Sequence, residues 1–348
     1  MKTWISPVSS SVQNSHVPAA PAAAQPVLSV SGLNVTFRSR RGPVPAVRDV
    51  SFDIARGEVF AVIGESGSGK SSLAMAMMAL LPPTALVTGE IRVTGIDLST
   101  LSGTERRRIC GERVSLINQD ALSSLNPCTT VGYQIAEMLM VHRAMGKRAA
   151  MAEAVRLLAL TGVPSPEGRV HHYPHQFSGG MRQRALIAIS LALQPDLVIA
   201  DEPTTALDAT IKAQILQLLT RLRAELGMSI LIITHDMGVV AKMADRMLVM
   251  YAGQAVETGT VEEVFARPTH PYTAALLEAV PRLDATERPL RAIPGAPPAP
   301  SALPPGCPFH PRCPVAEPRC AVEIPRAVTL AEGRTAACLL ARDRHVVA

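Results

Sequence analysis

The order of apolar and polar positions predicts strands in the first part of the chain. Between residues 27 and 54 apolar residues alternate with polar ones, and the pattern recurs at Gly89–Gly95. Alternation is typical of antiparallel strands that bury one face, which we expect at Leu28–Val30, Leu33–Phe37 and Ala46–Phe52. Other runs are almost wholly apolar, as in strands of a parallel sheet covered on both faces; these are Val59–Ile63, Leu197–Ala200 and Ser229–Ile233.

Helical periodicity fills the chain between these apolar strands. Apolar residues recur at spacings of three and four in Val131–Met140 and Ala149–Leu160. A loop at Tyr173–Gly180 precedes a further helical pattern at Met181–Leu193. Apolar strands that alternate with helices predict an α/β fold with a parallel sheet, which binds its ligand at the carboxyl ends of the strands.

Polar residues stand directly after the apolar strands. Gly64 follows the first of them, Asp201 the second, and Thr234-His235 the third. A shorter strand at Val114–Ile117 leads to Gln119 in the same way. Because these strand ends meet at one edge of a parallel sheet, we expect the polar residues to form one site.

Composition narrows the class of protein. The 348 residues are 47% hydrophobic and 18% charged, as in globular chains, with a net charge of +5 that is spread along the sequence. The aromatic content of 3% offers few stacking platforms, so a nucleic-acid surface is not expected. The apolar runs are too short to cross a bilayer. Residues 1–26, rich in Ser, Ala and Pro, resemble a disordered tail without the apolar core of a signal peptide.

The segment after the first apolar strand has the spacing of a phosphate-binding P-loop, G-x-x-x-x-G-K-S. Its glycines let backbone N–H groups surround phosphate oxygens, Lys70 places a positive charge on the β- and γ-phosphates, and the Ser71 hydroxyl suits Mg²⁺. A glycine-rich turn between a strand and a helix is the simpler alternative. The predicted nucleotide-binding residues are Gly64, Glu65, Ser66, Gly67, Ser68, Gly69, Lys70, Ser71 and Ser72.

Two adjacent carboxylates end the second apolar strand. Asp201 is placed as a Walker B residue that reaches Mg²⁺ beside the P-loop, and Glu202 is placed to polarise an attacking water. Without a P-loop, such a pair would also be explained as a turn that caps the next helix. With the P-loop present in the same sheet, the nucleotide interpretation is favoured.

Phe177–Arg184, with the sequence FSGGMRQR, resembles the signature motif of ATP-binding cassette (ABC) ATPases. The remaining motifs of that family follow in order, and the resemblance covers about residues 27–267. It departs from the usual Leu-Ser-Gly-Gly-Gln at Phe177 and Met181, as the peptide-transporter branch also does. The matched positions are Phe37 as the aromatic A-loop residue, Gln119 as the Q-loop, Asp201-Glu202 as Walker B, Ala206–Asp208 as the D-loop and His235 as the switch histidine.

The resemblance implies a P-loop NTPase core with an antiparallel β-subdomain and a helical subdomain at about residues 120–195. It implies two cassettes packed head to tail, with ATP between the P-loop of one and Ser178, Gly179 and Gly180 of the other, and with Asp208 nearby. Glu202 would be the general base. His235 would orient water and the γ-phosphate, and Gln119 would contact Mg²⁺ together with Ser71 and Asp201. Phe37 would stack on adenine, although it could equally be a core aromatic.

Arg267–Leu277 resembles the C-terminal extension of oligopeptide/dipeptide importers, and Ser123–Pro127 and Tyr173–Gln176 fit the same branch. The resemblance implies an ATPase subunit at the cytoplasmic face of the membrane. It would pair with a similar or identical ATPase beneath two permeases. An extracytoplasmic binding protein would deliver the peptide to these permeases. Another solute, such as nickel or glutathione, remains an alternative, as does a soluble ABC ATPase that acts on nucleic acid.

Four cysteines gather near the C-terminus after a proline-rich connector at Pro294–Pro305. In a chain expected in the cytosol, they suit thiolate metal ligation rather than disulfides. They lack the paired Cys-x₂-Cys of most zinc sites, so zinc is the second choice. Relatives with a similar cluster carry a [4Fe–4S] centre there, which the resemblance implies here; buried or free thiols are the alternative. The predicted ligands, in an extension over residues 268–348, are Cys307, Cys313, Cys320 and Cys338.

Overall fold

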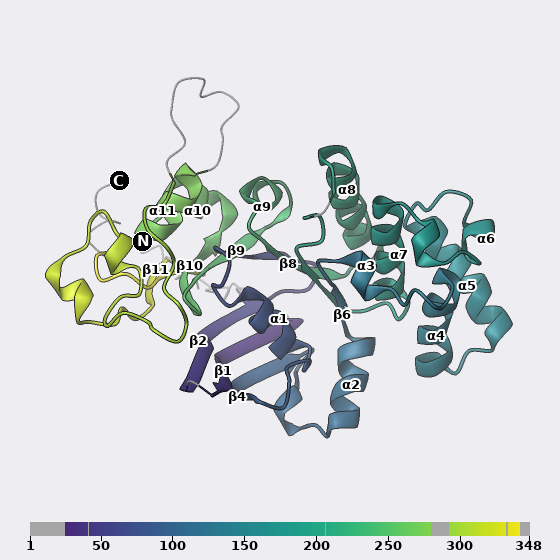
Figure 1. Cartoon of the computed structure of the whole chain (residues 1–348), viewed down its shortest axis with the longest axis horizontal. Helices are drawn as coiled ribbons and strands as arrows, with labels where there is room; N and C mark the ends of the chain where they lie inside the picture. The colour runs from purple at the N-terminus through teal and green to yellow at the C-terminus, as the bar shows by residue number, and fades with distance from the viewer. Residues whose placement is uncertain (1–24, 41, 206, 280–291, 332, 342–348) are drawn as a thin grey trace, which may run out of the picture.

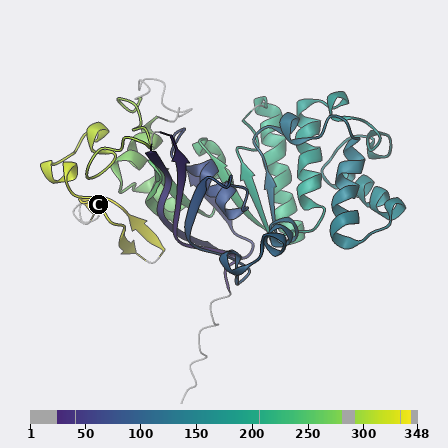
Figure 2. The ribbon, with the colours of Figure 1, turned by 60° about the horizontal axis from the view of Figure 1, so that its bottom comes forward.

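The computed structural model describes residues 25–40, 42–205, 207–279, 292–331 and 333–341. Most of the predicted N-terminal tail and Ala206 of the predicted D-loop lie outside these ranges. Two β-sheets occupy the centre of the described chain. A helical region lies on one side of them and the C-terminal residues on the other, as Figures 1 and 2 show.

The smaller sheet is antiparallel and has the strand order β2-β1-β4-β5. The predicted strands are confirmed, but Leu28–Val30 and Leu33–Phe37 belong to one long strand with register shifts between them. Gly32, at φ 57, lies at the irregularity, where only a residue without Cβ turns the chain easily. The strands are β1 (Leu28–Ser39), β2 (Gly42–Ile54), β4 (Ala85–Val93) and β5 (Ile96–Asp97).

The larger sheet has the order β11-β12-β10-β9-β3-β8-β7-β6. Its strands β9, β3, β8, β7 and β6 run parallel, which confirms the predicted parallel sheet. Every residue of β3 and β8 is buried, as their continuous apolar pattern requires. These five strands are β3 (Val59–Ile63), β6 (Val114–Ile117), β7 (Leu197–Asp201), β8 (Ser229–Thr234) and β9 (Arg246–Tyr251), and β10 (Gln254–Thr260) pairs antiparallel with β9.

Both faces of the parallel sheet are covered. One face packs against α7 (Gly179–Leu191), α8 (Ala209–Leu226) and α9 (Met237–Met243). The other packs against α1 (Lys70–Met77) and the antiparallel sheet. Alternate residues of β3 divide between the two cores, Ala61 facing the helices and Val62 facing α1. The sheet therefore holds the ends of its strands rigidly, and these ends carry the predicted site.

The helical region forms its own hydrophobic core. The predicted helices are confirmed, although α7 begins at Gly179 and ends at Leu191 rather than running from 181 to 193. Ser178 caps it by accepting a hydrogen bond from the N–H of Met181. The other helices here are α3 (Ala121–Ser124), α4 (Val131–Arg143), α5 (Lys147–Leu160), α6 (Pro166–Arg169) and the 3-10 turn η2 (Pro174–Gln176). In the chain, η1 (Leu98–Thr100) and α2 (Gly103–Glu112) come between β5 and β6.

The C-terminal residues extend the larger sheet, which no sequence pattern indicated. Strand β12 pairs with β10, and β11 pairs with β12. The buried Glu257 carboxylate of β10 accepts hydrogen bonds from the N–H groups of Thr269 and His270 and forms an ion pair with Arg334 of β12. The elements are α10 (Val261–Ala266), α11 (Pro271–Glu278), η3 (His310–Arg312), η4 (Pro318–Ala321), β11 (Val328–Ala331) and β12 (Arg334–Ala336). None of the helices in the described ranges is long and apolar enough to span a bilayer.

Candidate nucleotide site

The P-loop connects β3 to α1, as the sequence predicted. Gly64 has φ 154 and Gly69 has φ 102. A Cβ atom would lie 2.2 Å from the Met250 carbonyl oxygen at Gly64 and 2.3 Å from the Ala46 carbonyl oxygen at Gly69. Backbone from two other strands therefore approaches the loop so closely that both positions require glycine.

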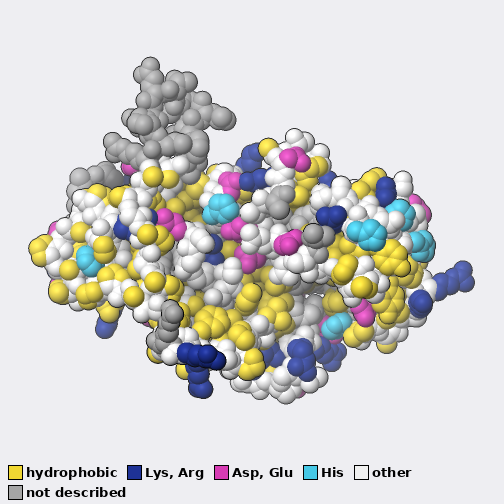
Figure 3. Space-filling view, in the orientation of Figure 1, with side chains coloured by type: hydrophobic (Ala, Val, Ile, Leu, Met, Phe, Trp, Pro, Cys, Tyr) yellow, Lys and Arg dark blue, Asp and Glu magenta, His cyan; other side chains and the backbone are white. Residues whose placement is uncertain are grey.

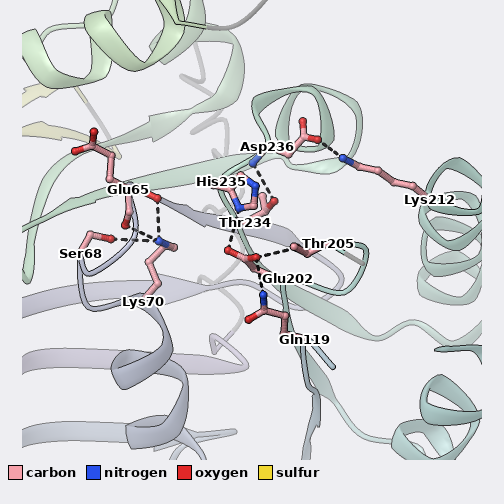
Figure 4. Close-up of polar contacts among 11 residues, drawn as sticks. Glu65, Ser68, Lys70, Gln119, Glu202, Thr205, Lys212, Thr234, His235 and Asp236 are labelled. Carbon is pink, nitrogen blue, oxygen red and sulfur yellow. Dashed lines mark hydrogen bonds and ion pairs between the residues drawn. The ribbon is translucent and has the colours of Figure 1, made fainter. Parts of the chain in front are cut away.

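Lys70 begins α1 and its ammonium lies inside the loop. Its Nζ donates to the carbonyl oxygens of Gly64 at 2.8 Å and Glu65 at 2.9 Å, and to the Ser68 hydroxyl at 3.4 Å (Figure 4). The side chain is buried, and burial lowers its pKa while the charges of Glu202, Asp201 and Glu65 oppose that shift. The hydrogen-bond acceptors of the Lys70 ammonium are uncharged oxygens, so negatively charged phosphate oxygens would bind it more strongly than these do.

The other residues of the loop have distinct surroundings. Ser68 is buried, whereas Ser66 and Gly67 are exposed where they line a cavity beside the loop. Ser72 is partly buried in the first turn of α1. The structure thus brings the predicted P-loop residues together around one turn, and their individual contacts with phosphate stay predictions.

Asp201 ends β7 beside the first turn of α1. The Ser71 hydroxyl lies close to its carboxylate. Burial raises the pKa of Asp201, interaction with the Ser71 hydroxyl lowers it, and the neighbouring Glu202 charge raises it further. A hydroxyl and one carboxylate side by side suit Mg²⁺, which keeps several waters and takes few protein ligands.

Glu202, the next residue, gathers three polar side chains around its carboxylate (Figure 4). Thr205 donates from Oγ1 at 2.8 Å, Gln119 donates from Nε2 at 3.3 Å, and His235 Nδ1 lies 2.9 Å from Oε1. These contacts join the ends of β6, β7 and β8. The structure thus brings Gln119, Glu202 and His235 together at one edge of the sheet, and their roles in catalysis stay predictions.

The backbone and charge state of Glu202 are also unusual. Its φ of 47 is rare for a residue with a side chain, and such strain costs about 1–3 kcal/mol and is concentrated at functional sites. Burial alone would raise the pKa of Glu202, but the hydrogen bonds from His235 and Thr205 and the charges of His235 and Lys70 outweigh it and lower the pKa. The carboxylate is therefore ionised at neutral pH, which is the state that its predicted role as general base requires.

The predicted signature residues lie at the start of α7, away from α1 (Figure 1). A Cβ atom on Gly180 would lie 2.8 Å from the Ile211 side chain of α8, and one on Gly179 would lie 3.7 Å from Leu207. Asp208 caps α8 by accepting from the N–H groups of Thr210 and Ile211. Ser178, Gly179, Gly180 and Asp208 therefore form one surface at the ends of two helices, separate from this chain's own P-loop.

Phe37 lies near the end of β1 and is partly exposed, and it packs against the core that includes α1. Its Cα is paired with those of Val44 and Ala85 in the antiparallel sheet. The exposed part of the ring leaves adenine stacking as a prediction.

The four C-terminal cysteines, distant in sequence, line one small cavity together with His270 and Phe309. Burial raises the pKa of Cys307 to about 11, and the charges of the other three cysteines add to that rise. Over the described ranges, no three or more His, Cys, Asp or Glu side chains are placed to hold a single metal ion. The structure therefore brings the predicted ligands together without itself supporting a zinc or iron site.

Sequence reasoning did not select several residues that contact the site. Thr205 binds Glu202, and Lys212 pairs with Asp236, the residue after His235. Tyr272 and Arg312 bind Glu65 of the P-loop from the C-terminal residues. Thr205 lies three residues after Glu202, so its proximity could have been inferred from the strand end, whereas nothing in the spacing of Tyr272 or Arg312 points to the P-loop.

Comparison with known proteins places this arrangement in a family. The model of the ABC transporter family matches residues 47–205, and the model of the oligopeptide/dipeptide transporter C-terminal region matches residues 256–320. The dipeptide transport ATP-binding protein DppD of Bacillus subtilis (strain 168) is 49% identical over 91% of this chain and 96% of its own length. The chain belongs to the ABC transporter ATPases.

Other members agree with this assignment. The oligopeptide transport ATP-binding protein OppD of Escherichia coli (strain K12) is 45% identical over 94% of this ABC ATPase and 97% of its own length. A solved dimer of the ATP-binding cassette MJ0796 bound to ADP and Pi superimposes with a TM-score of 0.61 at 28% identity. The superimposed region covers 67% of this chain and 98% of the MJ0796 chain. The predicted ABC ATPase fold is confirmed.

Proposed function

We propose that this ABC ATPase hydrolyses ATP to power the uptake of dipeptides or oligopeptides across the cytoplasmic membrane. The observation that carries the proposal is that Lys70, the neighbouring Ser71 and Asp201, and Glu202 with its polar contacts all lie at one edge of the parallel sheet. The match of residues 256–320 to the oligopeptide/dipeptide transporter C-terminal region supports peptides as the solute.

Each group at that edge has a role in the proposed reaction. Lys70 and the loop amides hold the β- and γ-phosphates, and Ser71 and Asp201 hold Mg²⁺, with Gln119 near it. Glu202 takes a proton from the attacking water, and its bond to His235 keeps the carboxylate oriented while His235 contacts water and γ-phosphate. Hydrolysis then requires no covalent intermediate, only positioning and charge stabilisation.

The site is completed by a second ATPase subunit, identical or similar. Ser178, Gly179 and Gly180 lie on a surface apart from this chain's P-loop, where the amino end of α7 is free to approach the γ-phosphate on a partner. The dimeric MJ0796 cassette with ADP and Pi supports the same assembly here. ATP would hold the two subunits together, and hydrolysis would release them.

Membrane partners would bind the exposed apolar surface. Figure 3 shows hydrophobic side chains over α1 and β4 and again over the helical region. Patches of this kind mark interaction sites. We propose that two permeases contact the helical region at the cytoplasmic face of the membrane, and that an extracytoplasmic binding protein delivers the peptide. Exposed apolar residues on these parts are Met75, Leu80, Leu86, Val87, Tyr133, Val141 and Tyr173.

Transport in a defined system tests this function. The chain would be co-expressed with its permeases and partner ATPase, reconstituted in proteoliposomes with the binding protein, and supplied with a radiolabelled dipeptide and oligopeptide. ATP-dependent uptake of either peptide is expected. Uptake of nickel or glutathione in place of peptide would show that the solute is not a peptide. Co-purification with nucleic acid in place of permeases would reject the transport function.

We also propose that Cys307, Cys313, Cys320 and Cys338 hold a [4Fe–4S] cluster. The donor set suits a cluster, because four thiols line one small cavity whose lining includes His270 and His310 but no carboxylate. A four-iron cluster is larger than one ion, so its thiolates stand farther apart than the ligands of zinc. When bound, the cluster supplies iron–thiolate bonds and a one-electron couple. The raised pKa of Cys307 without metal is expected of a buried thiol that ligation would deprotonate.

Metal analysis of an anaerobic preparation tests the cluster. We expect a brown protein with about four iron and four sulfide per chain, the stoichiometry of a Cys₄-held four-iron cluster. Cys307→Ser should lose most of the iron and the colour. Cys128→Ser, which alters an exposed cysteine outside the cavity, is the matched control and should keep both. A colourless wild type without iron would refute the cluster, and stoichiometric zinc would establish the second choice.

A further inference from the structure

Glu65 of the P-loop is held from outside the nucleotide site. Figure 4 shows its carboxylate pointing away from Lys70, although its carbonyl oxygen accepts from the Lys70 ammonium. The carboxylate is bound by Arg312, with Nη1 2.7 Å from Oε2 and Nη2 3.0 Å from Oε1. The Glu65 N–H donates to the Tyr272 hydroxyl at 2.8 Å. Main chain and side chain of one P-loop residue are thus both bound by the C-terminal residues.

The guanidinium of Arg312 is fixed before it reaches Glu65. Its Nε donates to the Pro294 carbonyl oxygen at 2.9 Å, and Nη1 also donates to the Tyr251 hydroxyl at 3.3 Å. The side chain is 5% exposed and lies over the rings of Tyr251 and Phe309. A planar fork fixed in this way binds a carboxylate at both oxygens with little further loss of entropy.

The segment that carries Arg312 is part of the wall of the cysteine cavity. Arg312 stands directly before Cys313, and Phe309, three residues earlier, lines the cavity with the four cysteines. The Cys307 N–H donates to the Cys320 carbonyl oxygen, and the Arg312 N–H donates to the Phe309 carbonyl oxygen. Phe309 in turn packs against Tyr251 and Tyr272. The cysteine segment and the P-loop therefore share one aromatic cluster.

The ion pair between Glu65 and Arg312 affects how the P-loop can bind phosphate, because Glu65 is negatively charged. An unpaired carboxylate on the P-loop would repel the phosphates of ATP, and Glu65 already acts electrostatically on Lys70. The pairing with Arg312 cancels that charge and directs it away from the loop interior. We infer that Arg312 is a positioning residue through which the C-terminal extension fixes Glu65 and permits ATP to bind. This inference rests on the proposed ATPase function.

The experiment measures Mg·ATP affinity by titration calorimetry, and the KM and kcat of hydrolysis, in the full chain. Arg312→Met should weaken ATP binding about tenfold while kcat at saturating ATP changes little. Adding Glu65→Gln to it should restore most of the affinity, because the unpaired charge is gone. Arg319→Met, which removes an exposed arginine of the same extension paired with Glu317, is the control and should bind ATP normally.

The outcomes separate this inference from the proposed function. If Arg312→Met binds ATP as tightly as Arg319→Met, or if Glu65→Gln restores nothing, the positioning role is rejected while the ATPase function stands. If the wild type binds no ATP, the function itself fails. If Arg312→Met does not fold, Arg312→Lys makes the same test, because lysine keeps the positive charge but cannot bind both carboxylate oxygens as the guanidinium does. We expect ATP to bind about threefold more weakly to Arg312→Lys, and Glu65→Gln to relieve that loss. Unchanged ATP binding by Arg312→Lys would overturn the inference.

Discussion

Replacing Glu202 by glutamine is expected to abolish ATP hydrolysis while leaving ATP binding intact. Glutamine keeps the size of the side chain and one acceptor oxygen, which can accept from Thr205 or contact His235 but cannot do both, and it cannot take a proton from water. Loss of a general base typically lowers turnover by about 10²–10⁴-fold. ATP-bound dimers should therefore accumulate, and size-exclusion chromatography with Mg·ATP, together with a phosphate-release assay, measures both effects.

A control and the pH profile sharpen that result. Glu153→Gln, on the surface of α5 where it pairs with Arg156, should hydrolyse ATP at the wild-type rate. Because the pKa of Glu202 is lowered, its carboxylate is lost only when the pH falls below the usual range of a glutamic acid. The wild-type rate should therefore hold through neutral pH and fall only in acid. Wild-type turnover by Glu202→Gln would remove Glu202 from its role.

The sequence predicted the centre of the site because strand ends are a local signal. Runs such as Val59–Ile63 must be buried, and in a parallel sheet their carboxyl ends meet at one edge. The meeting of Gln119, Glu202 and His235 follows from that geometry alone. The boundaries were less accurate, since α7 begins where Ser178 caps it rather than where the apolar period begins.

The contacts made by the C-terminal residues could not be predicted in the same way. Glu65 and Arg312 are 247 positions apart, and neither stands in a periodic pattern that faces the other. The pairing of β12 with β10 could not be predicted from the sequence either, because β12 spans only Arg334–Ala336, which is too short for an alternating pattern to be recognised. Such contacts depend on how separate elements pack, which a single sequence does not encode in local spacing.

The site therefore consists of parts that come from different sources. The P-loop and the strand ends are fixed by the sheet, whereas Ser178 to Gly180 face outward for a partner and Glu65 is held by the C-terminal residues. Under the proposed function, ATP binding would depend on the P-loop with its strand ends and on the held Glu65, and hydrolysis would depend on the partner-facing residues as well. Variants that separate binding from hydrolysis are consequently the most informative ones.

Lys70→Ala is expected to lose ATP binding, in contrast to Glu202→Gln. The buried ammonium is the positive side chain inside the loop, and removing a buried charge that pairs with an ionic ligand costs about 2–5 kcal/mol, or roughly 30- to several-thousand-fold in affinity. The carbonyl oxygens of Gly64 and Glu65 also lose their donor. Calorimetric titration with Mg·ATP should detect binding to wild type and Glu202→Gln but none to Lys70→Ala at the same concentrations.

A matched lysine and a folding measurement complete the comparison. Lys147→Ala changes an exposed lysine at the start of α5 and should bind ATP as the wild type does. Thermal unfolding without nucleotide checks that Lys70→Ala is folded; we expect a modest change, because the lost hydrogen bonds are offset by relief of the desolvation that lowers the pKa of Lys70. Added Mg·ATP should then raise the Tm of the wild type and not that of Lys70→Ala, since only a ligand that binds the native state stabilises it. A folded Lys70→Ala that bound ATP normally would show that the loop does not bind phosphate as proposed.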